Sequence, residues 1–330
     1  MDDNPFPYLV GFELEGFFRG GISGPELSTF NKSVGNLGCV TTELGCRQLE
    51  VVTNPFRVEN DKSVIHHLEQ LVACIPDEWE LEFCAKDPGY VSGVPKDWVR
   101  SPRYTAMLEA LAREKPDHWQ VVLEISKWCA IHINVGISPW SPEGILLMNV
   151  LNNVGPYIGA STREDCPDSS RHMAIWSEWA DVNRLPYHEN DVCCSKDAYA
   201  KEFADTSSLI KEGDGGEGSY EVDLVTPRSL DNIIDLGTNW KLCRPKLSST
   251  GQWYLEIRVL PSMPLKTLKF YVEEIFKGIQ AIVIWDKDNI SEYDFSIQDV
   301  SAAIQKASEV SEVFPKIYLS KQQWEYHFQL

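Results

Sequence analysis

The sequence has few basic residues relative to its acidic ones. Of 330 residues, 30 are Lys or Arg and 49 are Asp or Glu, which gives a formal net charge of -19. Nucleic acids and anionic membranes are bound through basic surfaces, so this balance argues against both as partners. An anionic small-molecule substrate would need metal ions and a local group of basic residues at its binding site.

Three common sequence signals are also missing. No apolar run approaches the roughly 18 residues of a membrane span, and the first seven residues lack the features of a signal peptide. The nine cysteines include no Cys-x-x-Cys pair that would indicate a zinc knuckle or a redox motif. We therefore expect a cytoplasmic protein with reduced thiols. The chain also lacks G-x-x-x-x-G-K-[ST], so any nucleotide must be held without a P-loop.

The apolar content is sufficient for one large folded domain, with 43% hydrophobic and 11% aromatic residues. Alternating apolar residues and turn signals predict strands at 8–18, 39–53 (two short strands), 79–84, 119–126, 128–137, 239–244 and 252–260. Helical patterns lie at 61–73, 102–113, 142–157, 265–286 and 297–310. Strands and helices do not alternate regularly, so the sequence predicts an α+β fold with a largely antiparallel sheet.

Acidic residues within apolar strand patterns are the most informative feature of the chain. They are Glu13, Glu15, Glu43, Glu50 and Glu256, and His132 lies in a similar segment. Two carboxylates about 4 Å apart repel by roughly 4 kcal/mol at an effective dielectric of about 20, so five in one cavity would destabilise the fold or become protonated, and a bound cation removes that cost. Oxygen ligands with at most one imidazole suit Mg²⁺ first and Mn²⁺ second. The alternative for each acid alone is the solvated face of an edge strand, and for His132 a hydrogen-bonded core position.

Two of these acids can share a site only if their strand is interrupted. Glu43 and Glu50 are seven residues apart, and an odd separation puts them on opposite faces of an unbroken strand. A turn or bulge at Gly45 would bring both carboxylates to the same face.

Basic residues lie close in sequence to the last of the acids. Lys241, Arg244 and Lys246 are on the strand expected to pair with that of Glu256, and Arg258 is two residues beyond Glu256. Arg103 opens a predicted helix and is a further candidate for anion binding. Arginine forks and lysine point charges suit a phosphate clamp. The alternatives are a solvated strand edge protected by charge and a surface ion pair.

Four ordered segments carry a family resemblance: residues 11–15 (GFELE), 42–55 (TELGCRQLEVVTNP), 131–135 (IHINV) and 254–260 (YLEIRVL). In order and spacing, they resemble the metal-binding signature of the glutamate-cysteine ligase family, part of the glutamine synthetase-like superfamily of carboxylate-amine ligases. The resemblance implies a curved, mostly antiparallel sheet, open like a half barrel, with the acids on its concave face and helices on its convex face. It also implies a single catalytic domain over residues 1–330, with a loop- and helix-rich segment at about 159–218 covering one side.

The same resemblance implies roles for individual residues. One metal ion would be held by Glu15, Glu43 and Glu50, a second by Glu13, His132 and Glu256, and a third would share Glu13 and Glu256. Arg258 would stabilise the phosphoryl group during its transfer, and Lys241 and Arg244 would bind phosphate, with Arg103 as a further candidate.

The activity that follows from the resemblance is ATP- and Mg²⁺-dependent amide formation through an acyl phosphate. L-Glutamate or a similar amino acid would supply the carboxylate, and cysteine or another amine would be the acceptor. Two other classes remain as alternatives. One is a phosphotransferase like the guanidino kinases, and the other is a non-catalytic protein that binds metal or nucleotide.

Overall fold

The structure is a computed structural model that describes residues 6–19, 22–43, 47–59, 62–88, 101–114, 127–167, 192–203, 207–213, 218–227, 230, 234, 241–289 and 296–315. The strand expected at 119–126 therefore lies outside the described residues. Among the helices that the structure describes, none combines the length and the apolar character that a membrane crossing requires.

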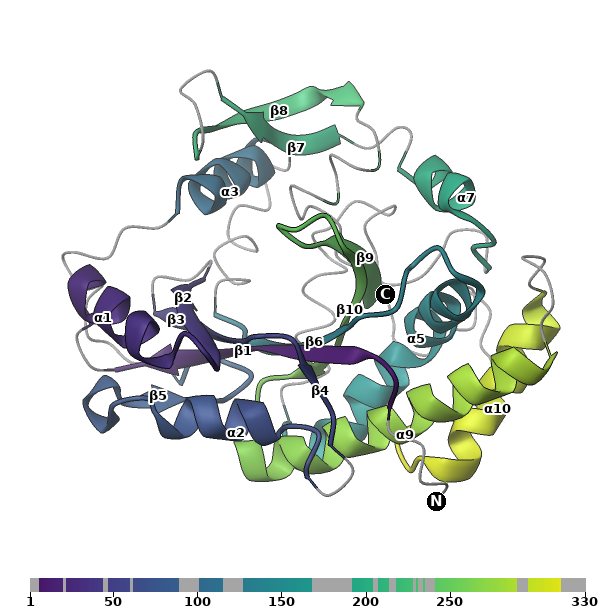
Figure 1. The fold of residues 1–330 in the computed structure, drawn as a ribbon. Helices are drawn as coiled ribbons and strands as arrows, with labels where there is room; N and C mark the ends of the chain where they lie inside the picture. The colour runs from purple at the N-terminus through teal and green to yellow at the C-terminus, as the bar shows by residue number, and fades with distance from the viewer. Residues whose placement is uncertain are drawn as a thin grey trace.

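A large antiparallel sheet forms the centre of the molecule (Figure 1). Its main path runs in the order β2-β3-β1-β6-β10-β9, and β4 and β5 also pair with β1. The strands are β1 (Leu9–Phe18), β2 (Gly38–Thr42), β3 (Gln48–Thr53), β4 (Phe56–Arg57), β5 (Leu81–Glu82), β6 (Ala130–Val135), β9 (Cys243–Leu247) and β10 (Trp253–Pro261). The two ends of this path, β2 and β9, do not pair with each other, so the sheet is open. The predicted α+β class with an open, antiparallel sheet is confirmed.

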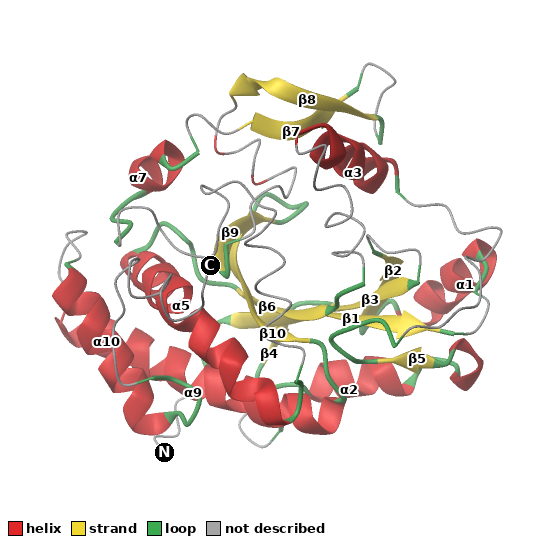
Figure 2. Ribbon diagram, turned by 180° about the vertical axis from the view of Figure 1, so that it is seen from behind, coloured by secondary structure: helices red, strands yellow, loops and turns green. Residues whose placement is uncertain are grey.

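Helices cover one face of this sheet, and the other face curves inward where β10 bends toward β9 (Figures 1 and 2). The helices are α1 (Gly24–Val34), α2 (His66–Ala73), α3 (Pro102–Glu114), α5 (Pro142–Ser161), α7 (Lys196–Lys201), α9 (Leu265–Asn289) and α10 (Ile297–Val310), with short 3-10 turns at Asp77–Trp79 and Thr162–Glu164. Of these, α2, α5, α9 and α10 lie along the covered face, while α3 lies on the opposite side (Figure 1).

The strand alternation that was read from the sequence decides which residues form the core. In β1, Phe12 and Leu14 are fully buried, and in β10 Leu255 and Ile257 are fully buried. Helix α5 packs directly on β9 and β10. At Gly155 of α5, a Cβ atom would lie 2.6 Å from a side-chain carbon of Leu242, so glycine permits this close approach of helix and sheet. The apolar residues of each strand thus point toward the helices, and the intervening acids point the other way.

The structure differs from the prediction at the strand expected at 239–244 and in the segment at 159–218. The strand expected at 239–244 begins at Cys243 and continues to Leu247, so Lys241 precedes it. Of the segment at 159–218, residues 168–191 lie outside the described residues. The described part includes α7 and a 3-10 turn, and also the strand β7 (Ser207–Glu212), which pairs with β8 (Tyr220–Pro227) in a separate two-stranded sheet. Both strands pack against α3, and the apolar residues Leu209 and Ile210 of β7 are fully buried.

Candidate functional site

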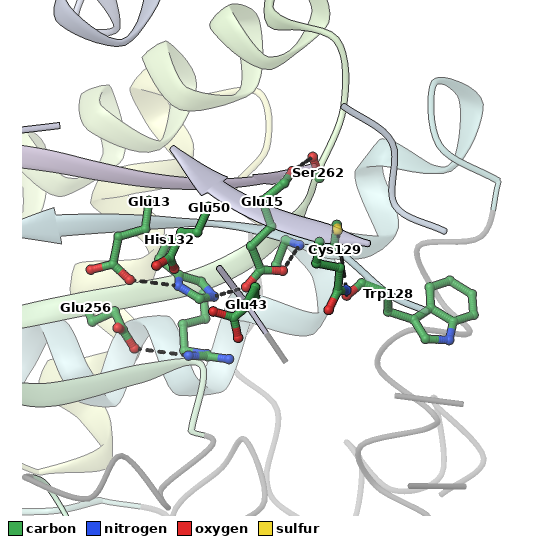
Figure 3. A network of polar contacts seen from close by, with 12 residues as sticks. Glu13, Glu15, Glu43, Glu50, Trp128, Cys129, His132, Glu256 and Ser262 are labelled. Carbon is green, nitrogen blue, oxygen red and sulfur yellow. Dashed lines mark hydrogen bonds and ion pairs between the residues drawn. The ribbon is translucent and has the colours of Figure 1, made fainter. Parts of the chain in front are cut away.

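The strand register brings the acids of distant segments into one row. β1 is central, and Glu15 lies opposite Glu50 of β3 while Glu13 lies opposite His132 of β6. In the next pair of strands, Glu256 of β10 lies opposite Asn134 of β6. We call the group Glu13, Glu15, Glu43, Glu50, His132 and Glu256 the acidic cluster (Figure 3). It lies on the sheet face that is turned away from α5 and α9.

Glu13 and His132 form a direct polar contact at the centre of the cluster (Figure 3). His132 Nδ1 lies 3.2 Å from Glu13 Oε2, and the Asn134 amide donates a 2.7 Å hydrogen bond to Glu13 Oε1. Burial alone would raise the pKa of Glu13, but the contact with His132 outweighs it and the net shift is downward. The pKa of His132 is lowered by burial and by Arg258, so its ring is neutral at pH 7, which is the form that binds metals.

Glu15 and Glu50 have the opposite electrostatic environment. Burial, followed by the charge of Glu43, raises the pKa of Glu15 to about 8, even though the Ala130 N–H donates a 2.7 Å hydrogen bond to Glu15 Oε2. Burial and the charges of Glu13 and Glu43 raise the pKa of Glu50 well above its ordinary value. In the absence of a cation, both carboxyl groups therefore tend to hold protons at neutral pH.

Glu43 reaches the cluster from the end of β2. Its carboxylate raises the pKa of both Glu15 and Glu50, which places it near that pair. The hydroxyl of Tyr104, in the first turn of α3, donates a 2.7 Å hydrogen bond to Glu43 Oε2. Glu43 and Glu50 thus approach each other although they lie seven residues apart, as expected for a strand interrupted between β2 and β3.

Three cationic side chains surround Glu256, which is 0% exposed. The Arg244 Nε donates to Glu256 Oε2, the Arg258 Nη1 donates to the same oxygen at 3.2 Å, and Lys246 Nζ lies 3.6 Å from Oε1. Burial alone would raise the pKa of Glu256, but Arg244, Lys246 and Arg258 hold it well below its ordinary value. One end of the cluster therefore consists of carboxyl groups with raised pKa values, and the other carries a concentration of positive charge.

The ligand atoms fall into two overlapping groups that suit divalent cations. In each group, atoms from all three residues lie within 4.8 Å of one another: Glu13, His132 and Glu256 form one, and Glu15, Glu50 and His132 form the other. Among the described residues, the buried His132 Nε2 has no hydrogen-bond partner, and it lies 3.6 Å from Glu15 Oε1. Carboxylate oxygens with one imidazole are ligands for Mg²⁺ or Mn²⁺. The first group is the same trio that the sequence resemblance implies, whereas in the second His132 takes the place of Glu43.

Two predicted site residues, Lys241 and Arg103, belong neither to the acidic cluster nor to the cations around Glu256. Lys241 is 1% exposed and forms a 2.8 Å ion pair with the buried Glu202, so it belongs to a different polar contact from the acidic cluster. The prediction that grouped it with Arg244 relied on a strand that in fact begins after it. The Arg103 guanidinium lies 5.6 Å from the ring of Tyr104, which itself contacts Glu43. Arg103 is therefore beside the cluster.

Sequence reasoning gave no role to several residues that the structure places at the cluster. Asn134 and Tyr254 each lie two residues from a predicted ligand on the same strand face, and that spacing is a signal that could have identified them. Burial, with the charges of Glu13 and Glu256, raises the pKa of Tyr254. Tyr104 comes from a helix on the other side of the site, and no local sequence pattern connects it with Glu43.

The comparisons with known proteins add one structural likeness. No protein-family model matches the chain, and no curated protein sequence matches it. Among solved structures, the chain is similar to the glutamate-cysteine ligase of Francisella tularensis in complex with AMP, with a TM-score of 0.49 and 14% identity. The alignment covers 97% of this chain and 76% of that chain. A likeness at this level does not establish the family or the activity of this chain.

Proposed function

We propose that the protein is an ATP- and Mg²⁺-dependent carboxylate-amine ligase. The observation that carries the proposal is the pair of overlapping three-residue groups, in which carboxylates from three strands and one neutral imidazole from a fourth converge on one face of the sheet. Three cationic side chains, Arg244, Lys246 and Arg258, adjoin this face. A site with both anionic and cationic ends suits a metal-bound triphosphate, because metals bind the carboxylates and arginines bind phosphate oxygens.

The residues of the cluster fit divalent cations. Glu13, His132 and Glu256 would hold one ion, and Glu15 and Glu50 with Glu43 would hold another, while a third would share Glu13 and Glu256. The raised pKa values of Glu15 and Glu50 support this fit, because a cation relieves the repulsion that favours protonation. Bound ions supply charge neutralisation and orientation of donor and acceptor in phosphoryl transfer.

The protein's own side chains bind and orient the phosphates. Arg258 and Arg244 present planar donor groups beside Glu256, and Lys246 adds a point charge. In the proposed reaction, a substrate carboxylate attacks the terminal phosphorus of ATP and ADP leaves. The amine then attacks the acyl phosphate, loses a proton and releases phosphate. Following the sequence resemblance, L-glutamate or a similar amino acid is the carboxylate donor, and cysteine or another amine is the acceptor.

The experiment that tests this function combines product identification with two variants. The protein is incubated with Mg²⁺, ATP, L-glutamate and a mixed pool of amines, and ADP, phosphate and new amides are measured by mass spectrometry. We expect amide formation matched to ADP release. Glu13→Gln and Glu256→Gln should each abolish turnover while the protein remains folded.

The matched control is Glu274→Gln. Glu274 is a buried glutamate of α9 that pairs with Lys277 and lies outside the acidic cluster, so its loss should leave turnover intact. Retained activity in both cluster variants would contradict the proposal. ADP formation without an amine would favour a phosphotransferase, and binding of Mg²⁺ and ATP without any turnover would favour a non-catalytic protein.

A further inference from the structure

Tyr104 connects a separate structural unit to the acidic cluster. Helix α3 packs against β7 and β8, and this unit lies on the opposite side of the large sheet from α2 and α9 (Figures 1 and 2). The hydroxyl of Tyr104 donates a 2.7 Å hydrogen bond to Glu43 Oε2, from a position 61 residues away in the chain. This is a direct contact between α3 and a residue of the cluster.

The backbone around Tyr104 is held in place by the start of the helix. The Tyr104 N–H donates to Ser101 Oγ at 3.3 Å, and the Thr105 N–H donates to the Ser101 carbonyl at 3.0 Å. On the same side of α3, Met107 and Leu111 follow Tyr104 by three and seven residues, and both are buried. Tyr104 therefore projects from a packed, capped helix, and the position of its hydroxyl is set by that helix.

Glu43 follows the end of β2, where its backbone N–H donates to the Gln48 carbonyl at 3.3 Å. Its carboxylate accepts the hydrogen bond from Tyr104, so this contact contributes to the direction of the side chain. Its carboxylate is near enough to Glu15 and Glu50 to raise the pKa of both, yet it is not part of either close ligand group. A hydrogen bond that fixes one carboxylate oxygen also sets the direction of the other.

We propose that Tyr104 is a positioning residue for divalent-cation binding, which holds Glu43 Oε2 so that this carboxylate joins Glu15 and Glu50 around one ion. The inference rests on the proposed metal-dependent function and extends it to a residue outside the sheet. Hydrogen-bond partners of metal ligands orient those ligands, and their loss typically lowers metal affinity by about 10- to 100-fold. The cation itself would be Mg²⁺, for which Mn²⁺ serves as a spectroscopic probe.

The test measures Mn²⁺ binding to the full-length protein by electron paramagnetic resonance and isothermal titration, without ATP. Tyr104→Phe keeps the ring and removes the hydroxyl. We expect one class of Mn²⁺ sites to weaken by about 10- to 100-fold, while the other class is unchanged. An unchanged or higher affinity in Tyr104→Phe would overturn the inference.

The matched control is Tyr271→Phe. The Tyr271 hydroxyl donates a 2.8 Å hydrogen bond to Asp165 Oδ2, which is the same kind of contact outside the acidic cluster. We expect Mn²⁺ binding as in the wild type. Equal weakening in the Tyr104 and Tyr271 variants would indicate a general loss of stability and would also overturn the inference.

A double-mutant cycle keeps the inference falsifiable if packing changes. Glu43→Gln should weaken the same class of sites, and the double variant Tyr104→Phe/Glu43→Gln should be no weaker than Glu43→Gln alone. Additive losses would mean that Tyr104 acts independently of Glu43. Absence of Mn²⁺ binding in the wild type would refute the proposed function, whereas wild-type binding that is insensitive to Tyr104→Phe would refute only this role of Tyr104.

Discussion

Glu256 and Arg258 illustrate how charge is arranged at the level of single residues. Glu256 is fully buried, and an isolated carboxylate in that position would be costly. Its Oε2 accepts from both Arg244 and Arg258, so the charge is compensated within the protein even before a cation binds. Glu15 lacks comparable compensation, and its pKa rises to about 8 as a result of burial and the charge of Glu43. Neighbouring acids of one cluster thus carry different charges at pH 7.

Replacing Arg258 by lysine tests whether the shape of its donor group matters in addition to its charge. A lysine keeps the positive charge near Glu256 but cannot present two parallel N–H donors to a phosphoryl group. We expect Arg258→Lys to lower ATP turnover by about 10²- to 10³-fold, the usual loss when one preorganised donor is removed. Turnover is measured as ADP release, and thermal melting checks the fold. Arg113→Lys, at an exposed ion pair of α3, is the control, and an Arg258→Lys enzyme with more than a tenth of wild-type activity would contradict the expectation.

At the level of elements, helix α5 fixes the position of the strand that carries Arg244. The Asn152 amide donates a 2.8 Å hydrogen bond to the Cys243 carbonyl, and the Cys243 N–H donates to Asn152 Oδ1 at 2.9 Å. One side chain of the helix thereby pairs with the first residue of β9 in the way that a neighbouring strand would. Arg244 follows directly, so the helix layer determines where this cation meets Glu256.

Asn152→Leu tests this link between α5 and β9. The substitution keeps the side-chain volume roughly constant but leaves the buried N–H and carbonyl of Cys243 without this partner. Each unsatisfied buried group costs about 1–3 kcal/mol, so we expect the free energy of unfolding to fall by about 2–5 kcal/mol. Urea denaturation followed by tryptophan fluorescence measures the change. Asn36→Leu, at an exposed turn, should differ from the wild type by less than about 0.5 kcal/mol, and a similarly small effect of Asn152→Leu would refute the link.

The sequence predicted those elements whose pattern is local. The alternation of apolar and polar residues predicts β1, β3 and β10, and within each strand it separates Glu13, Glu15 and Glu256 from the apolar face. The register that sets Glu13 opposite His132 joins segments that are 119 residues apart, and it emerges only from packing. The strand expected at 239–244 was placed too early in the sequence, because strand ends depend on tertiary contacts. Tyr104 reaches Glu43 across the site, and no spacing rule covers a contact between a helix and a distant strand end.

At the scale of the whole molecule, the acidic cluster couples folding to pH and to metal. The carboxyl group of Glu15 has a pKa of about 8 in the folded state and an ordinary value of 4.5. Its contribution to stability is complete below 4.5 and is lost as the pH rises toward 8, because the unfolded chain ionises first. His132 acts in the other direction, since its lowered pKa favours folding as the pH rises toward 6.5. Between about pH 6.5 and 8, the effect of Glu15 therefore prevails, reinforced by that of Glu50.

This balance predicts that stability in a chelator falls between pH 6.5 and 8, whereas the affinity for Mg²⁺ rises over the same range. In a chelator, the melting temperature should fall between pH 6.5 and 8, as Glu15 and Glu50 lose their protons next to one another. Because metal binding displaces those protons, Mg²⁺ affinity should rise over the same range, by up to about tenfold per pH unit for each proton released. The stabilisation by Mg²⁺ is therefore larger at pH 8 than at pH 6.5. Differential scanning fluorimetry with Mg²⁺ titrations at both pH values measures it.

Glu15→Gln is the matched variant for these trends, because an amide has nearly the same shape as the protonated acid and does not ionise. In a chelator, its melting temperature should depend less on pH than that of the wild type, and its stabilisation by Mg²⁺ should be smaller and should differ less between pH 6.5 and pH 8, with the remaining difference due to Glu50. The net charge of -19 makes a general response to cations the main competing cause. That response is screened by salt, whereas buried ligands are screened much less, so the measurement is repeated at raised NaCl. If Mg²⁺ stabilised Glu15→Gln as strongly as the wild type in high salt, Glu15 would not take part in the coupling between Mg²⁺ and folding.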